Sequence, residues 1–499
     1  MALTPLSRVL GHALAGLALG GLLSLVAASA APAASGSIAT APGYHGGRSF
    51  VRGFADSVWI WSGQPSLAPA KWDADAYAEG AGIVEVEVDW TTYEPTAPVA
   101  GANPTSSAST DYSNWAELDQ TVETLAANNL HVMFLITAAP RWAYGESPAG
   151  TVNTEGYDIN TTALGNFVQA LANRYDGSFP APATPGARLP RVTYYQDWAE
   201  ANNNARFGPQ WQGAPGRRVN VGADLYRKSL NAFYAGVKAG DRSDKVVFTG
   251  VEPWGDPSGG AWVAPTTFLA NVLCLNAKLA KEPCSDPAHF DILAADPYEA
   301  GNVPPTSPAL SPTDVQIPDL WKLERIMNAA VSAHTVLPDS HKPMWVTEFG
   351  YNTKAPSPYG VQAEKEARWQ EDAFYVAWKQ GVDVFLWYLI RDWSGHNYID
   401  DWFSGTYTYN AAPKASWTSY RFPFVVAKDS SRAQIWGIAP TNGTLSVQQA
   451  VGGTWRTIKV FHARFGAIFT ALLPLPAAKT GVYRAVQGTQ TSLPWTAQL

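Results

Sequence analysis

Short apolar runs alternate with longer amphipathic runs from about residue 51 to residue 389. A short apolar run predicts a buried strand, and a run with an apolar period near 3.6 residues predicts a helix. Strands and helices that alternate in this way are typical of a parallel sheet covered by helices. The pattern predicts eight strands, the number that closes a (β/α)8 barrel. These strands are residues 54–59, 83–90, 131–138, 192–198, 245–251, 290–295, 343–348 and 382–389.

Helices are predicted between these strands by apolar residues that recur on one face. Within residues 115–128, Leu118, Val122 and Leu125 follow one another at intervals of three or four residues. Comparable periodicity predicts further helices at residues 164–175, 224–238, 320–331 and 363–380. Residues 50–410 are therefore predicted to hold the strands and helices of one barrel.

The helical period disappears from about residue 416 onward. Short alternating runs are separated there by Gly, Asn and Pro, a pattern that predicts a small all-β sandwich-like domain. Such a module either binds sugar or packs against the barrel, and packing is favoured because no row of aromatic residues stands out. The predicted strands are residues 434–438, 444–449, 455–461, 467–472 and 481–486.

The amino-terminal pattern predicts export. Residues 13–27 form an uncharged Ala, Leu and Gly run, and Ala28-Ser29-Ala30 fits a cleavage site for a signal peptide. An uncleaved anchor is the alternative, because residues 9–34 carry no charge and are long enough to span a membrane. We expect cleavage and a secreted protein. The expected organisation is a signal peptide at 1–30, a flexible lead-in at 31–49, a barrel at 50–410 and the β module at 416–499.

The composition supports large cores and argues against nucleic acid as a partner. The 499 residues are 46% hydrophobic, 12% aromatic and 15% charged, which excludes global disorder. The formal net charge is −7, and no run of Lys or Arg forms a stripe that could neutralise phosphates. We expect a monomer without a transmembrane segment after cleavage of the signal peptide.

Two cysteines, Cys274 and Cys284, lie close together just before a predicted strand. In an exported protein such a pair oxidises, so we predict one structural disulfide that closes a short loop. A metal site is the alternative, but further Cys or His ligands at usable spacing are missing from the sequence. We expect neither a metal nor an organic cofactor.

The candidate chemistry lies in two glutamates, each at the end of an apolar run. Glu200 ends the fourth predicted strand, and Glu348 ends the seventh. Carboxyl ends of barrel strands face one opening, so the two side chains should meet there. A pair of carboxyl groups about 5 Å apart can cleave a glycosidic bond with retention, one as acid/base and the other as nucleophile. The alternative is that each glutamate merely ends a strand and pairs with a nearby arginine.

The motifs around these glutamates resemble those of clan A retaining glycoside hydrolases, above all families 5 and 39. The resemblance covers roughly residues 51–393, and the carboxyl-terminal part resembles the small β domain often fused to such barrels. The motifs that carry it are Pro140-Arg141-Trp142-Ala143, Trp198-Ala199-Glu200-Ala201-Asn202, Asp296-Pro297-Tyr298, Thr347-Glu348-Phe349-Gly350 and Trp387.

The resemblance implies a role for each of these positions. It makes Glu200 the acid/base and Glu348 the nucleophile, with Tyr298 as the tyrosine that hydrogen-bonds the nucleophile. It makes Trp387 the platform under the sugar. Trp142 is a candidate wall of a sugar subsite, because the C–H faces of sugars stack on indole rings.

The chain also departs from the family pattern. The clan usually has Asn before the acid/base and Pro after it, where this chain has Ala199 and Ala201. Asn202 could supply the polar contact that Ala199 cannot make. Glu85 replaces an arginine near the end of the second strand, and Asp296 replaces a histidine. These two carboxylates either recognise a basic or unusual sugar or raise the pKa of the nucleophile. Alternatively, Glu85 is an ordinary strand carboxylate that pairs elsewhere.

The sequence therefore predicts a secreted retaining O-glycoside hydrolase that acts on β-linked oligo- or polysaccharides. The alternative is a catalytically weakened barrel that binds carbohydrate at the cell surface without turning it over, and Ala199 favours that reading. A metal-dependent barrel hydrolase is disfavoured, because the first strand lacks a His-x-His motif and the whole chain holds only 8 His.

Overall fold

The computed structural model describes residues 50–498 apart from 57–68, 147–154, 214–216, 257–259, 355–356, 358–359, 394–401, 430 and 475–479. The predicted signal peptide and lead-in lie outside the described residues. Among the helices that are described, none is both long and apolar enough to cross a membrane.

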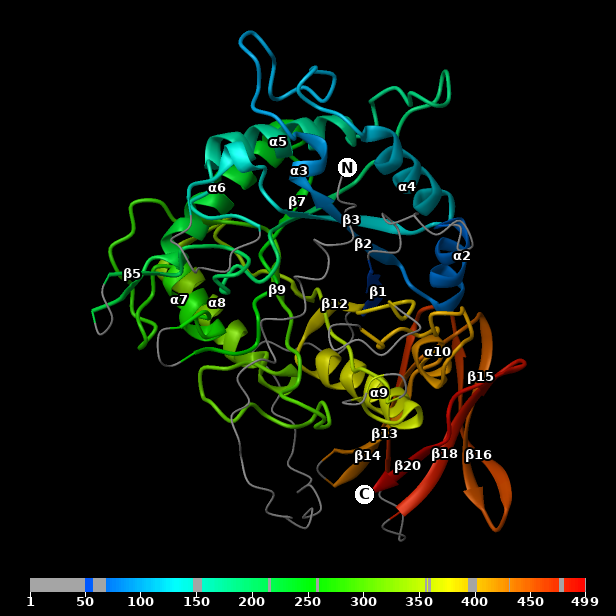
Figure 1. The fold of residues 1–499 in the computed structure, drawn as a ribbon. Coiled ribbons are helices and arrows are strands. Elements are labelled where there is room, and N and C mark those ends of the chain that lie inside the picture. Colours follow the sequence, from blue (N-terminus) through cyan, green and yellow to red (C-terminus); the bar gives the residue numbers. More distant parts are fainter. Residues whose placement is uncertain are drawn as a thin grey trace.

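Eight parallel strands form the barrel that the sequence predicts (Figure 1). They follow one another in chain order around the sheet, and the last strand pairs with the first. Bridges from Val247 to Ile292 and from Val251 to Ala295 join the fifth and sixth barrel strands. The (β/α)8 prediction is thereby confirmed. The strands are β1 (Val51–Ala55), β2 (Ile83–Asp89), β3 (His131–Thr137), β4 (Tyr194–Asp197), β7 (Lys245–Val247), β9 (Leu293–Ala295), β11 (Met344–Val346) and β12 (Val382–Trp387).

Strand β1 begins three residues before its predicted start at residue 54. Arg52 and Gly53 interrupt the apolar run in the sequence, yet both pair with β12. Gly53 is required there, because a Cβ atom at this position would lie 2.2 Å from the carbonyl oxygen of Ile83 on β2. The first residues of this strand were therefore not predicted, because Arg52 and Gly53 are not hydrophobic.

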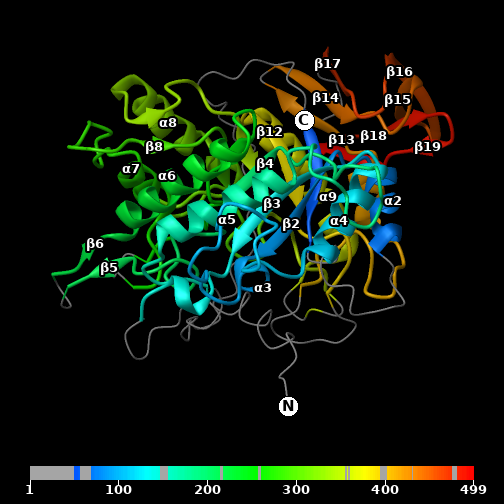
Figure 2. The same ribbon diagram turned by 90° about the horizontal axis from the view of Figure 1, so that it is seen from above.

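Helices cover the outside of the barrel, as Figure 1 and the view from above in Figure 2 show. All five predicted helices are present. Four further helices, α2, α3, α7 and α10, were not predicted. The helices are α2 (Pro69–Glu79), α3 (Trp90–Tyr93), α4 (Trp115–Ala127), α5 (Thr161–Arg174), α6 (Gly222–Gly240), α7 (Pro265–Val272), α8 (Trp321–Ala333), α9 (Ala363–Lys379) and α10 (Ala415–Arg421).

The barrel interior changes from apolar to charged along the strands. Every second residue of a strand faces inward, and the inner apolar cluster includes Ile83, Val247 and Leu386. Further along β2, the same alternation turns Glu85 and Glu87 inward. The carboxyl-terminal end of the barrel is therefore lined by acids rather than by aliphatic side chains.

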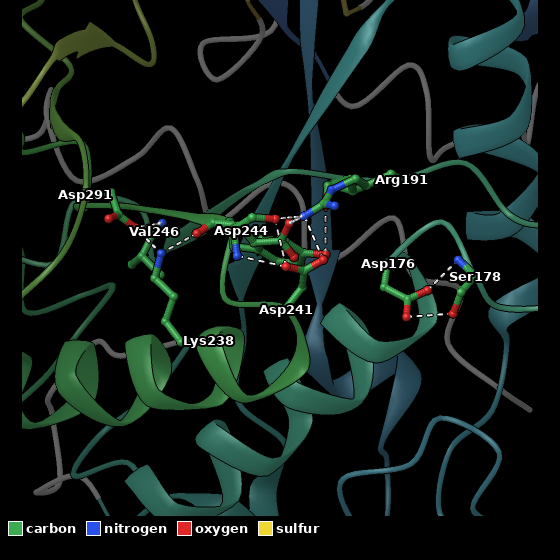
Figure 3. Close-up of polar contacts among 11 residues, drawn as sticks. Asp176, Ser178, Arg191, Lys238, Asp241, Asp244, Val246 and Asp291 are labelled. Carbon is green, nitrogen blue, oxygen red and sulfur yellow. Dashed lines mark hydrogen bonds and ion pairs between the residues drawn. The ribbon is translucent and has the colours of Figure 1, made fainter.

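Ion pairs tie the strands together at the opposite, amino-terminal end of the barrel (Figure 3). Arg191, just before β4, contacts Asp241 at 2.8 Å and Asp244 at 2.5 Å, which both precede β7. Lys238 of α6 contacts Asp291 before β9 at 2.8 Å. These contacts fix the order of neighbouring strands at the end that stabilises such barrels.

The predicted disulfide is present, and it joins Cys274 to Cys284 across a separation of 10 residues. The bridge lies in the connection between α7 and β9. Short paired strands complete this half of the molecule: β5 (Trp211–Gln212) with β6 (Val219–Asn220), and β8 (Ala288–His289) with β10 (Val336–Leu337).

The carboxyl-terminal module is all-β, as predicted, and its sheets are antiparallel. It lies on the side of the barrel away from α7, in orange and red in Figures 1 and 2. One sheet holds three strands and the other five. The first holds β13 (Phe424–Asp429), β14 (Arg432–Ile438) and β17 (Ile468–Pro474), and the second holds β15 (Gly443–Val451), β16 (Thr454–Ala463), β18 (Thr480–Gln487), β19 (Gln490–Thr491) and β20 (Trp495–Gln498).

The module packs against helix α9 of the barrel. The Tyr375 hydroxyl donates to Gln434 at 2.9 Å, and the ring of Trp378 lies 5.9 Å from that of Trp436. Helix α10 spans the predicted start of the module at residue 416, and Tyr420 on this helix stacks on Phe54 of β1 at 4.4 Å. The apolar contacts thus extend from the barrel into the module.

Candidate active site

Glu200 and Glu348 lie at the same end of the barrel, as their positions in the sequence predict. Glu200 follows β4 by three residues, and Glu348 follows β11 by two. Both side chains are half-buried. Burial, and after it the charge of Glu200, raises the pKa of Glu348. The fold therefore brings the two predicted carboxyl groups close enough for their charges to interact.

The backbone around Glu200 turns sharply. Trp198 and Glu200 have φ values of 66° and 47°, in the left-handed region that non-glycine residues seldom occupy. Each such residue costs about 1–3 kcal/mol, and such costs gather at functional sites. The amide of Glu200 donates to the carbonyl of Gly250 at 2.9 Å, and a Cβ at Gly250 would lie 2.1 Å from Asp296. Close packing with the following strands thus holds the turn.

Tyr298 donates a hydrogen bond from its hydroxyl to Glu348 Oε1 at 2.8 Å. Its ring stacks on Phe349 at 5.7 Å, which fixes the direction of the hydroxyl. Burial and the charge of Glu200 raise the pKa of Glu348 to about 7, whereas the bond from Tyr298 and the charge of Arg206 lower it. The tyrosine therefore favours the ionised carboxylate against the effect of burial.

Further acids surround Glu348 inside the barrel. Burial, then the charge of Glu348, raises the pKa of Glu85 and of Asp296 well above the ordinary values. The hydroxyl of Thr347 donates to Asp296 at 2.6 Å, and Gln196 donates to Thr347 at 3.3 Å. Glu85 and Asp296 therefore lie close enough to Glu348 for the charges of the three carboxyl groups to act on one another.

Arg206 is the cation nearest to the pair among the described residues, and it was not predicted. Its guanidinium contacts Glu155 at 2.6 Å and Glu200 at 3.5 Å. Its carbonyl accepts from the indole of Trp198 at 3.0 Å, so the loop after β4 folds back on itself. Nothing in the local sequence marks this arginine, because its partners come from the loops after β3 and β4.

Glu252 is a second residue that sequence reasoning missed. It follows β7, and its carboxylate accepts from the amide of Asn203 at 2.8 Å. Burial, then the charge of Glu200, raises its pKa well above the ordinary value. The long connection after the fifth barrel strand thus adds a carboxyl group to the neighbourhood of Glu200.

Asn202 was predicted to contact substrate, and the structure contradicts that prediction. The residue is fully buried. Its amide group donates to the carbonyls of Glu252 at 3.0 Å and Val263 at 2.9 Å, and its oxygen accepts from the amide of Glu252 at 2.9 Å. Asn202 therefore joins two loops of the site.

Trp387 was predicted to form a sugar platform, and this prediction is also wrong. The side chain has no exposed surface, and its indole donates to the carbonyl of Ser404 at 2.7 Å. The next residue, Tyr388, is half-buried and packs against the inner barrel cluster. Burial, then the charge of Glu348, raises the pKa of Tyr388, so Tyr388 takes the place beside the candidate nucleophile.

Trp142 lies half-buried near the carboxyl ends of β2 and β3. Its indole donates to the carbonyl of Glu94 at 3.0 Å, and its ring meets the buried Trp90 edge-on at 5.9 Å. The hydrogen bond orients the ring, so Trp142 remains a candidate subsite wall. Among the described residues, no group of three or more His, Cys, Asp or Glu side chains has the arrangement of a metal site.

No protein-family model and no curated protein matches the chain. Solved structures do match it. A family 39 glycoside hydrolase from the gut symbiont Bacteroides cellulosilyticus WH2 aligns over 86% of this chain and 81% of its own, with 16% identity and a TM-score of 0.52. The chain has the fold of a family 39 glycoside hydrolase. A family 39 β-xylosidase from Caulobacter crescentus aligns over 88% of this chain and 96% of its own, with 13% identity and a TM-score of 0.46.

Proposed function

We propose that the protein is a secreted, monomeric retaining glycoside hydrolase that acts on β-linked oligo- or polysaccharides. The observation that carries the proposal is the hydrogen bond from Tyr298 to Glu348, at the end of the barrel where Glu200 also lies. A carboxylate that is oriented by a tyrosine and coupled to a second carboxyl group has the parts that double displacement requires. The barrel fold shared with a family 39 glycoside hydrolase supports the same conclusion.

The proposed reaction has two steps. Glu200 donates its proton to the glycosidic oxygen while the ionised Glu348 attacks the anomeric carbon, so the leaving alcohol departs and a glycosyl ester forms on Glu348. Glu200 then removes a proton from water, and the water oxygen attacks the anomeric carbon and releases Glu348. Tyr298 holds the attacking oxygen in place and disperses its charge, whereas Trp142 and Tyr388 contact the sugar.

Glu200 can act as the general acid only while its carboxyl group is protonated. Two interacting carboxyl groups lose their protons in two steps, so one proton is shared by the pair over an intermediate range of pH. The reactive form has that proton on Glu200. The guanidinium of Arg206, 3.5 Å from Glu200, favours the charged form of this acid and opposes that arrangement.

A catalytically weakened, carbohydrate-binding barrel is the second candidate. The observation that favours it is the raised pKa of Glu348, because burial and the charge of Glu200 bring it to about 7. A protonated Glu348 is a poor nucleophile, so such a protein would hold a sugar without forming the ester.

A panel of aryl glycosides distinguishes the two candidates. Wild type should turn over at least one β-glycoside, and Glu348→Gln should lower kcat by about a thousandfold or more. Glu364→Gln is the matched control, because it makes the same change at an exposed position in the first turn of α9. Binding of a glycoside without turnover by wild type at any pH would favour the second candidate.

A further inference from the structure

A pocket of about 570 Å³ lies between the barrel and the carboxyl-terminal module. Its barrel wall includes Val51 at the start of β1 and Gly82 just before β2. Its module wall is the turn between β16 and β17 and the start of β17. These barrel residues lie at the amino-terminal ends of the strands. The pocket is therefore at the opposite end of the barrel from Glu200 and Glu348, and its volume is typical of small-ligand sites.

Arg52 of β1 is one of the residues that line this pocket. The side chain is 3% exposed, and its guanidinium lies 5.0 Å over the ring of Tyr420. Gly80 makes room for it, because a Cβ at Gly80 would lie 2.7 Å from Nη2 of Arg52. The Nη1 atom is buried and has no hydrogen-bond partner among the described residues. A buried charged donor without an acceptor is costly, so an acceptor that reached this guanidinium would be bound favourably.

The charges around Arg52 favour an anion. Among the described residues that line the pocket there is no Asp or Glu. Burial lowers the pKa of Arg52 to about 10, so the guanidinium stays charged at neutral pH. Burial raises the pKa of the neighbouring Glu79 well above its ordinary value, which weakens it as a counter-ion. Asp75 is paired with Lys71, and Arg421 adds a second positive charge nearby.

Two exposed aromatic rings flank the pocket. Tyr77 of α2 is 40% exposed, and Phe465 in the turn of the module is 39% exposed. Their ring centroids lie 5.8 Å apart with a tilt of 48°, so together they form an apolar wall built from both domains. Aromatic faces of this kind stack on the C–H faces of sugar rings.

We propose that this pocket binds a uronic acid residue of an acidic oligosaccharide. The carboxylate accepts hydrogen bonds from the guanidinium of Arg52, and the pyranose ring packs against Tyr77 and Phe465. A carboxylate matches a guanidinium in charge and in the spacing of its two oxygens. The site leaves the opening with Glu200 and Glu348 free, so it would tether an acidic glycan while the other end of the barrel remains accessible.

Calorimetric titration of the full chain with a galacturonic acid trimer tests this proposal. Wild type should bind the trimer with a Kd of about 1 mM or tighter. Arg52→Gln should weaken binding by about tenfold or more, because it removes the charged donor. Tyr77→Ala combined with Phe465→Ala should also weaken it, and these changes affect only exposed side chains. Trp455→Ala is the control, because it removes an exposed aromatic ring at the other end of β16.

Two further ligands and one further variant complete the experiment. A neutral galactose trimer should bind much more weakly than the acidic one, and benzoate, which has a carboxylate but no sugar ring, should also bind weakly. Glu348→Gln should bind the acidic trimer like wild type, which separates this site from the proposed reaction. The proposal would be overturned if wild type bound the acidic and neutral trimers equally, or if it bound neither. It would also be overturned if both pocket variants bound the acidic trimer as tightly as wild type.

Discussion

The hydroxyl of Tyr298 donates to Glu348 Oε1 at 2.8 Å, within a part of the barrel where acids outnumber cations. Tyr298→Phe removes this donor and keeps the ring, so the pKa of Glu348 should rise further. We expect kcat/KM near neutral pH to fall about tenfold, and the acidic limb of its pH profile to move to higher pH. Tyr351→Phe is the control, because Tyr351 also packs on Phe349 but donates to the carbonyl of Val303. An unchanged profile in Tyr298→Phe would contradict the assigned role.

The pH profile of wild type should report the ionisation of Glu348. The nucleophile acts as a carboxylate and its pKa is raised to about 7, so kcat/KM should decline as the pH falls below about 7. Glu200→Gln removes the charge that raises this pKa, so the acidic limb should move to lower pH. An aryl glycoside with a good leaving group makes this measurable, because its departure needs no proton from Glu200. A limb that stays in place would show that the two glutamates are not coupled.

Arg206 should influence the pH range in which Glu200 is protonated while Glu348 is ionised. Its positive charge lowers the pKa of Glu348 and favours ionised Glu200. Replacement by Gln should therefore shift both limbs of the kcat/KM profile to higher pH. Because Glu155 contacts Arg206 and is buried, the double variant Arg206→Gln/Glu155→Gln avoids an isolated buried charge. A shift to lower pH in the double variant would refute this reading.

Buried carboxyl groups should make the protein less stable as the pH rises. Burial raises the pKa of Glu299 to about 9 and that of Glu366 to about 8. Each group binds a proton in the folded state that it releases in the unfolded state once the pH exceeds its unfolded pKa, about 4.3. The contribution of these groups to the free energy of unfolding is therefore fully present below the unfolded pKa. It is lost as the pH rises through the pKa values of the folded state.

Thermal unfolding between pH 5 and pH 9 measures this effect. Glu299→Gln should flatten the decline of Tm with pH, because a neutral amide replaces a group that must take up a proton to fold. Glu364→Gln, at an exposed position, should leave the slope unchanged. A wild-type Tm that rises steadily with pH would contradict the prediction.

The barrel could be predicted from the sequence because most of its strands are distinct apolar runs. The positions of Glu200 and Glu348 followed from their places directly after two such runs. The start of β1 could not be predicted in the same way, because Arg52 and Gly53 are held by pairing with β12 and not by their own hydrophobicity.

The errors at the site have a common physical cause. Trp387 lies one residue from Tyr388, and only the alternation of faces along β12 decides which of them reaches the opening. Counting by two from Val384 through Leu386, both in the inner cluster, leads to Tyr388. Arg206 and Glu252 owe their importance to contacts between loops, which a single sequence does not reveal. For the same reason Asn202 was assigned to substrate, although its hydrogen bonds join the loops to each other.

Trapping the glycosyl ester tests the central claim most directly. An activated 2-deoxy-2-fluoro glycoside of the sugar that wild type accepts should inactivate the enzyme. The fluorine slows both formation and breakdown of the ester, and the good leaving group restores the rate of formation alone, so the ester accumulates. Peptide mass spectrometry should then find one sugar on the peptide that carries Glu348, and none in Glu348→Gln. A sugar attached to Glu200, or turnover that proceeds without any label on Glu348, would contradict the account.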